Sequence, residues 1–233
     1  MAEKRIDETE FKKTVNLLQG YIKNVKEEAS AIEKSGKNLH NYASKIEESL
    51  KLLMKEKEDK LTNKLHLHKF LKNVSLTADG TTVYIKGFSN MMTFGAEKPL
   101  SKENGMYFEV EFTNFKSAGI GLSTKEFDFN SNDAVGQAPK SYGFSNKGTY
   151  WSAASKFKNF DLIGFTIGDT VGCGLQFDES TKKHFIYFTR NSTFIGVKQY
   201  VNVFNGVFPT ISLSGSNAAA KVNFGKTYFM YKQ

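Results

Sequence analysis

Glu109 and Glu111 are the pair of side chains in this sequence that could most readily do acid–base chemistry. Residues two apart on a strand point to the same face, so two carboxylates could exchange protons with one bound molecule. The residues that alternate with them are apolar, and strand alternation therefore turns the carboxylates outward. We expect both to face solvent and to have no catalytic role.

The remaining reactive side chains lack a catalytic arrangement. Cys173 alternates with glycines in the segment Val171–Phe177, which predicts a small residue of the core. The four histidines, His40, His66, His68 and His184, show no spacing to a nucleophile. Motifs of serine hydrolases, nucleotide-binding loops and zinc proteases are absent from the sequence. We therefore expect a protein that is not an enzyme and that holds no metal and no cofactor.

Composition limits where the protein works and what it binds. The net charge is +8, yet Arg5 and Arg190 are the only arginines among 32 basic residues, and specific recognition of bases depends on arginine. A single cysteine excludes an internal disulfide, and charges at the very start disfavour a signal peptide. No stretch approaches the roughly 18 apolar residues of a membrane span. We expect a cytoplasmic protein, with the nucleus as the alternative, that neither spans a membrane nor binds a specific nucleic acid.

Residues 1–70 carry an apolar repeat that predicts a long helical coiled coil. Steps of seven residues give one row of large apolar side chains and a second row with small residues in its middle. The rows are Phe11, Leu18, Val25, Ile32, Leu39, Ile46 and Leu53, and Val15, Ile22, Ala29, Gly36, Ala43 and Leu50. The small residues permit close helix approach or a bend near Ser35 and Gly36. A parallel dimer, an antiparallel dimer and a helical hairpin stay as alternatives, and we expect a homo-oligomer formed through residues 11–53.

Residues 71–233 predict a mainly β domain. Short alternating segments are separated by turn signals, among them Asp79–Gly80, Asn104–Gly105 and Asn205–Gly206. Regular strand–turn spacing without helical periodicity is typical of an antiparallel β-sandwich. In Ala118–Ser123 glycines alternate with apolar residues, which indicates close packing of backbones rather than a phosphate-binding loop.

Seven segments, taken in order, resemble the SPRY (B30.2) family. They are Tyr107–Phe112, Gly119–Lys125, Ser141–Phe144, Gly168–Leu175, Phe188–Asn191, Phe208–Ile211 and Val222–Gly225. The resemblance is nearest to the Ran-binding-protein-M subtype. It implies a concanavalin-type jelly roll and a protein-interaction module, used as an adaptor or scaffold.

Two departures from the family pattern bear on function. Ser192 stands where the family usually has glycine after Asn191, which predicts a wider turn. A single cysteine cannot supply the zinc sites of a RING or B-box domain, so ubiquitin-ligase activity is not carried over from relatives that have them. The partner and the pathway stay open.

The resemblance also implies a shallow peptide-binding surface built from loops at one end of the sandwich. Rigid strands commonly hold such loops in place. Large apolar residues in polar surroundings mark three candidate loops, and two basic residues could pair with an acidic peptide. The candidates are Trp151, Tyr150, Phe127, Phe129, Phe88, Met91, Lys140 and Arg190. Trp151 is the leading candidate, and the alternative is that its ring closes one end of the sandwich.

Two other functions fit parts of the sequence. A lectin-like sandwich would use the same aromatic loops to stack on sugar rings, although the expected cytoplasmic location counts against it. A basic surface binder would attract nucleic-acid phosphates or membrane headgroups through its excess of lysine. We expect a protein or peptide ligand rather than either of these.

Overall fold

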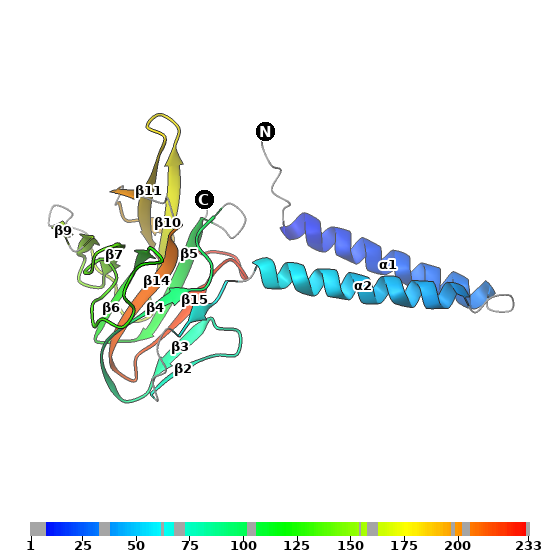
Figure 1. The fold of residues 1–233 in the computed structure, drawn as a ribbon, viewed down its shortest axis with the longest axis horizontal. Coiled ribbons are helices and arrows are strands. Elements are labelled where there is room, and N and C mark those ends of the chain that lie inside the picture. The colour runs from blue at the N-terminus through cyan, green and yellow to red at the C-terminus, as the bar shows by residue number, and fades with distance from the viewer. Residues whose placement is uncertain are drawn as a thin grey trace. The chain divides into compact units, whose positions relative to one another are not determined.

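The computed structural model describes residues 8–32, 38–61, 63–67, 73–101, 106–153, 155–157, 163–196, 199–201 and 206–231. The chain divides into two compact units, Met1–Leu61 and Thr62–Gln233. The first is helical and the second consists of strands (Figure 1). Leu65–His66 already forms a strand, so the helical part ends before residue 70, where the sequence predicted its end.

The helical unit contains α1 (Glu8–Ile32) and α2 (Asn38–Leu61), which lie side by side and run in opposite directions (Figure 1). Val15 and Ala29 on α1 and Ala43 on α2 are buried. An ion pair between Lys26 and Glu47 joins the two helices.

The predicted long coiled coil is therefore not shown, and residues 8–32 and 38–61 form two antiparallel helices, as in the hairpin alternative. Alanines at positions 29 and 43 are small enough to let the two helices approach, so part of the heptad repeat is satisfied inside one chain. The bend predicted near Ser35 and Gly36 falls outside the described residues.

The second unit is a sandwich of two antiparallel sheets, as predicted. Among the described residues, the seven-stranded sheet contains, in spatial order, β1 (Leu65–His66), β4 (Phe88–Ala96), β14 (Phe208–Ser216), β6 (Ser117–Ser123), β7 (Ser141–Ser145), β8 (Tyr150–Ser152) and β9 (Ser155–Phe157). The eight-stranded sheet contains β12 (Thr193–Phe194), β11 (Lys183–Arg190), β10 (Thr170–Asp178), β5 (Tyr107–Asn114), β15 (Ala219–Asn223), β3 (Thr82–Ile85) and β2 (Val74–Leu76), with β13 (Gln199–Val201) beside β11.

Alternating residues of both sheets pack into one aromatic core. The rings of Phe112 and Phe165 stack at 4.9 Å, and those of Phe144 and Phe188 meet at 5.5 Å. Burial of one such side chain contributes about 2–3 kcal/mol. Cys173 is fully buried in this core, as predicted, and burial raises the pKa of its thiol, so the thiol stays protonated and unreactive.

The outer face of the seven-stranded sheet is covered by residues 124–140. Thr93 Oγ1 on β4 donates a hydrogen bond to the Asp133 carbonyl at 2.8 Å, and Val135 N donates to Ser212 Oγ on β14 at 2.8 Å. Gly119 on β6 lies under this segment, and a Cβ there would meet Val135 Cγ1 at an ordinary contact distance of 3.4 Å. Gly121 is the glycine of β6 that serves close packing, as the sequence indicated, because a Cβ there would lie 1.9 Å from the Tyr142 carbonyl oxygen of β7.

The C-terminal segment covers the part of the eight-stranded sheet around Tyr107 and Glu109, which the sequence did not predict. The Phe229 ring packs edge-on against Tyr107 at 4.9 Å. Glu109 is buried and accepts hydrogen bonds from Met230 N and Tyr231 N, each at 2.8 Å. The prediction that Glu109 faces solvent is therefore wrong, whereas Glu111 is exposed as expected.

Candidate partner-binding surface

Trp151 lies on the outward side of β8. Its neighbour Tyr150 points into the core, and in the strand pairing Trp151 stands opposite Gly143 of β7. The side chain is partly exposed. It rests against Gly136, which has a positive φ of 88° and where a Cβ would come within 2.7 Å of Trp151 Cβ. Only glycine fits both the conformation and the space, so glycine at position 136 allows Trp151 to pack closely here.

The segment beside Trp151 is held in place by hydrogen bonds rather than left as an open loop. Ser141 Oγ accepts from Gly136 N at 2.8 Å and donates to the Ala138 carbonyl at 2.8 Å. Thr124 N donates to the Lys140 carbonyl at 2.9 Å. These bonds fix a surface made of Trp151 with the exposed residues Gln137, Pro139 and Lys140, which we call the Trp151 surface.

Phe127 and Phe129 follow β6 at the same end of the sheet as Lys140. Phe127 is only 5% exposed, and its ring meets that of Phe129 edge-on at 4.8 Å. Phe129 is partly exposed. Phe127 is therefore buried against Phe129 and does not offer an exposed anchor.

Three further candidates do not join the Trp151 surface. Tyr150 is fully buried and packs at 6.0 Å from Phe188, so the prediction of an exposed anchor at this position is wrong. Burial raises the pKa of its hydroxyl. Met91 lies on β4 and is partly exposed, and Phe88 begins the same strand, but its side chain falls outside the described part of the structure. Strand pairing places Phe88 opposite Ser216, at the end of the sheet away from Lys140.

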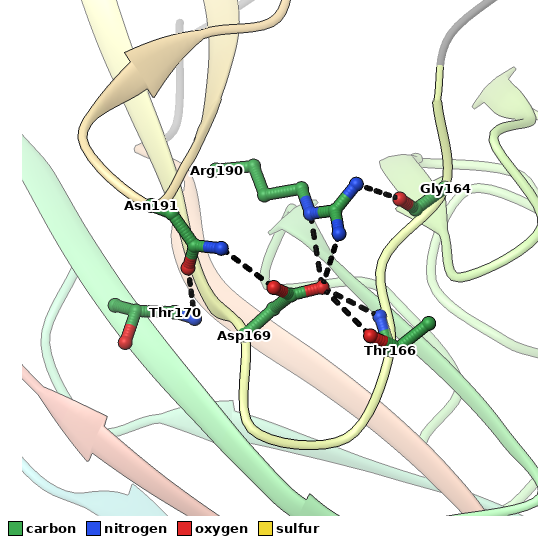
Figure 2. A network of polar contacts seen from close by, with 6 residues as sticks. All are labelled: Gly164, Thr166, Asp169, Thr170, Arg190 and Asn191. Atoms are coloured by element: carbon green, nitrogen blue, oxygen red, sulfur yellow. Dashed lines mark hydrogen bonds and ion pairs between the residues drawn. The ribbon is translucent and has the colours of Figure 1, made fainter.

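Arg190 is committed to an internal ion pair, which corrects the prediction that it is available to an acidic peptide. Its Nε and Nη2 donate to Asp169 Oδ2 at 2.9 and 2.8 Å, and its Nη1 donates to the Gly164 carbonyl at 2.8 Å (Figure 2). Asp169 is 7% exposed. A guanidinium with three such bonds ties the segment before β10 to the end of β11.

Asp169 accepts further hydrogen bonds from both of these segments. Asn191 Nδ2 donates to Oδ1 at 2.6 Å, and Thr166 N donates to Oδ2 at 2.7 Å (Figure 2). Burial alone would raise the pKa of Asp169, but the hydrogen bonds from Thr166, Asn191 and Arg190 outweigh it, and the pKa lies below its usual value. The network is structural: every group in it is used to join two loops.

The turn that carries Asn191 is not wider than the family pattern, contrary to the prediction. Arg190 pairs with Thr193 across a two-residue loop in which Asn191 and Ser192 both have positive φ, 47° and 69°. This is the geometry of a type I′ hairpin turn, which glycine adopts more easily than serine. Ser192 Oγ donates to the Met230 carbonyl at 2.9 Å, which gives serine a role here in holding the C-terminal segment.

The structure also bears on metal clusters, membrane spans and the histidines. In the described part of the chain, no group of three or more His, Cys, Asp or Glu side chains could hold a metal ion. No described helix is long and apolar enough to cross a membrane. His66 lies exposed on β1, and His68 falls outside the described residues.

The fold and its motifs match a known family. A family model of the SPRY domain matches residues 105–227, more than half of the chain. The chain belongs to the SPRY family. SPRY domains are typically protein-interaction modules and are generally not catalytic.

Two curated relatives match part of the chain. The chain is 33% identical over 121 residues to the dual specificity protein kinase splA of Dictyostelium discoideum, which covers 51% of this chain and 5% of that protein. It is 24% identical over 168 residues to the Ran-binding proteins 9/10 homolog of Drosophila melanogaster, which covers 68% of this chain and 17% of that protein. The chain thus spans a small part of the length of both relatives.

Two solved human structures share the fold. A human SPRY domain aligns with a TM-score of 0.54 at 21% identity, over 69% of this chain and 100% of that one. The SPRY domain of human HERC1 aligns with a TM-score of 0.51 at 12% identity, over 67% of this chain and 96% of that one. The predicted antiparallel sandwich is therefore confirmed.

Proposed function

We propose that this protein is a non-catalytic adaptor whose SPRY domain binds a peptide segment of a protein partner at the Trp151 surface. The observation that carries the proposal is a partly exposed tryptophan, the only one in the chain, which lies on a strand and packs against Gly136, in the segment that ends at the exposed Lys140. Tryptophan dominates binding energy at many protein interfaces because its large ring excludes water from a wide area. A surface already held by hydrogen bonds loses little entropy on binding.

The chemistry of the Trp151 surface favours a short extended segment with one apolar and one acidic side chain. The apolar group would pack on the indole of Trp151, and the carboxylate would approach the ammonium of Lys140. Arg190 takes no part, because Asp169 already neutralises it. A Ran-binding-protein-like specificity is in keeping with the second relative but is not needed for this proposal.

The helical hairpin would add avidity. If it brings two SPRY domains together, two weak peptide contacts act as one through their high effective concentration. The absence of a disulfide and the buried Cys173 agree with a cytoplasmic location, which we propose for the protein.

Selection from a displayed peptide library tests this function. We expect the wild-type protein to enrich peptides with a shared motif, and Trp151→Ala to raise the dissociation constant for a selected peptide by at least about tenfold. Lys140→Glu should weaken acidic peptides in particular. Fluorescence anisotropy with the labelled peptide measures both effects.

The control is Tyr84→Ala, because Tyr84 is an exposed aromatic residue of the other sheet, on β3. It should leave the peptide affinity unchanged, and all variants should keep the thermal unfolding transition of the wild type. Equal losses from Tyr84→Ala and Trp151→Ala, or a Trp151→Ala protein that no longer folds, would reject the Trp151 surface as the binding site.

A further inference from the structure

The helical hairpin exposes large apolar side chains that a two-helix unit cannot cover. They include Leu18 (43% exposed) and Tyr21 (75%) on α1, and Tyr42 (68%), Ile46 (54%) and Leu53 (63%) on α2. Val15, Ala29 and Ala43, which face the other helix, are at most 7% exposed. Each helix thus carries an apolar stripe wider than the strip used between them, and globular helices normally bury the whole stripe.

The exposed halves of the two stripes lie on the same side of the hairpin. On α1, Tyr21 comes one residue before Ile22 of the inward row, and on α2, Tyr42 comes one residue before the inward Ala43. At about 100° per residue, both are turned away from the contact line in the same sense about their own helix axes. Because the helices run in opposite directions, equal turns bring both side chains to one face.

Leu18 and Ile46 lie on the same side of the hairpin as Tyr21 and Tyr42. Each follows an inward residue, Val15 or Ala43, by three positions, which is a turn of about 60° in that same sense. Leu53 stands three positions after Leu50 in the same way. These five exposed residues therefore form one continuous surface, which we call the apolar face of the hairpin.

Glu28 and Lys45 are arranged for a two-fold partner. Glu28 comes one residue before the inward Ala29 and lies within the apolar face, and Lys45 comes two residues after the inward Ala43 and lies at the edge of that face. The ion pair between Lys26 and Glu47 shows that these two positions lie at the same level along the hairpin. Two residues further toward the connection, Glu28 and Lys45 share the next level, and both are exposed. A second hairpin packed face to face about a two-fold axis parallel to the helices places its α2 beside α1, and its Lys45 opposite Glu28.

We propose that the apolar face of the hairpin packs against the same face of a second copy of this chain, forming an antiparallel four-helix bundle. Such a contact is isologous, so one set of apolar residues and one pair of opposite charges serve both copies. The bundle buries the part of each apolar stripe that the hairpin leaves exposed. This inference deepens the oligomer formation suggested above and is independent of the Trp151 surface.

Sedimentation velocity on the full chain tests the bundle, with one substitution on each side of α2. Leu53 lies in the apolar face and is 63% exposed, whereas the exposed Ser44 follows the inward Ala43 by one residue and is therefore turned about 100° in the opposite sense, away from the apolar face. We expect a wild-type dimer, a dissociation constant raised by at least about tenfold in Leu53→Glu, and no change in Ser44→Glu. Helix content by circular dichroism should be equal in the two variants.

A charge exchange tests the register of the bundle. Glu28→Lys should weaken the dimer by several-fold, and adding Lys45→Glu should restore it. A wild-type monomer at every concentration, equal weakening by Ser44→Glu and Leu53→Glu, or no rescue by the double exchange would overturn the proposal. A monomer that still binds the selected peptide rejects the bundle alone, whereas a dimer without peptide affinity rejects the proposed function alone.

Discussion

Asp169→Ala lowers the free energy of unfolding of the SPRY domain by about 3 kcal/mol, because it leaves several buried donors without their shared acceptor. Arg190 would lose both bonds to the carboxylate and keep only the one to Gly164. Asn191 and Thr166 would lose their bonds as well. Two loops of the sandwich are joined through this one side chain, so urea unfolding followed by tryptophan fluorescence should show the loss.

Asp178→Ala is the matched control for this substitution. Asp178 also accepts hydrogen bonds within a hairpin turn, from the hydroxyls of Ser180 and Thr181, but its partners are exposed to solvent. Water replaces those bonds, so little stability should be lost. Similar losses from the two substitutions would contradict a special role for Asp169.

The lowered pKa of Asp169 adds a pH dependence with a definite sign. A carboxyl whose pKa is lower in the folded state stabilises the protein above its unfolded-state pKa of about 3.9, and that stability is lost as pH falls through the folded-state pKa. As the pH falls below about 3.9, the wild type should therefore lose more stability than the Asp169→Asn variant does. Asp79, whose pKa is lowered to about 2 by hydrogen bonds from Thr77 and Thr81, acts in the same direction and remains in both proteins.

Gly172→Ala destabilises the SPRY domain by about 2–3 kcal/mol and loosens the C-terminal segment. A Cβ at position 172 would lie 1.9 Å from Tyr107 Oη and 2.4 Å from Thr189 Oγ1, so the tyrosine must move. Tyr107 Oη donates to Glu109 at 2.9 Å, and Glu109 in turn holds the Met230 amide. Urea unfolding measures the first effect, and the rate of carboxypeptidase or trypsin cleavage near the C-terminus measures the second.

Gly119→Ala provides the control for a glycine on an outward strand face. A Cβ at Gly119 would have its nearest contact at 3.4 Å, to the methyl group of Val135. This substitution should change stability little, and the C-terminal segment should stay protected. If Gly172→Ala behaved like Gly119→Ala, the tight packing of Tyr107 over β10 would be refuted.

The sandwich could be predicted from sequence because its strands carry local patterns. Phe108, Val110 and Phe112 alternate with polar or outward residues, and all three are buried in the core. The position of Cys173 follows from the same alternation. Local periodicity reports which residues share a face, and in β5, β6 and β10 that was enough.

The binding site could be predicted only in part, because burial by distant segments leaves no local signal. Glu109 alternates as an outward residue, but Met230 and Tyr231 cover it. Arg190 is an isolated charge in the sequence, because its partner Asp169 lies 21 residues earlier, directly before β10. Tyr150 and Trp151 are neighbours in a polar segment, and only the register of β7 and β8 decides which one is buried.

The helical unit shows the same limit. The heptad rows correctly marked the apolar positions, but they do not tell whether a helix meets another chain or folds back on its own. Ala29 and Ala43 allow the second arrangement, and the large residues left exposed, such as Leu53, show that the rows are satisfied only in part within one chain.

Hydrogen–deuterium exchange on the complex with a library-selected peptide tests the central claim most directly. If the SPRY domain binds its partner at the Trp151 surface, the bound peptide slows hydrogen exchange in residues 136–143 and 149–153. Exchange in residues 164–170 and 190–193 stays unchanged. Slowed exchange confined to the Asp169 network or the C-terminal segment, with none around Trp151, would contradict this account.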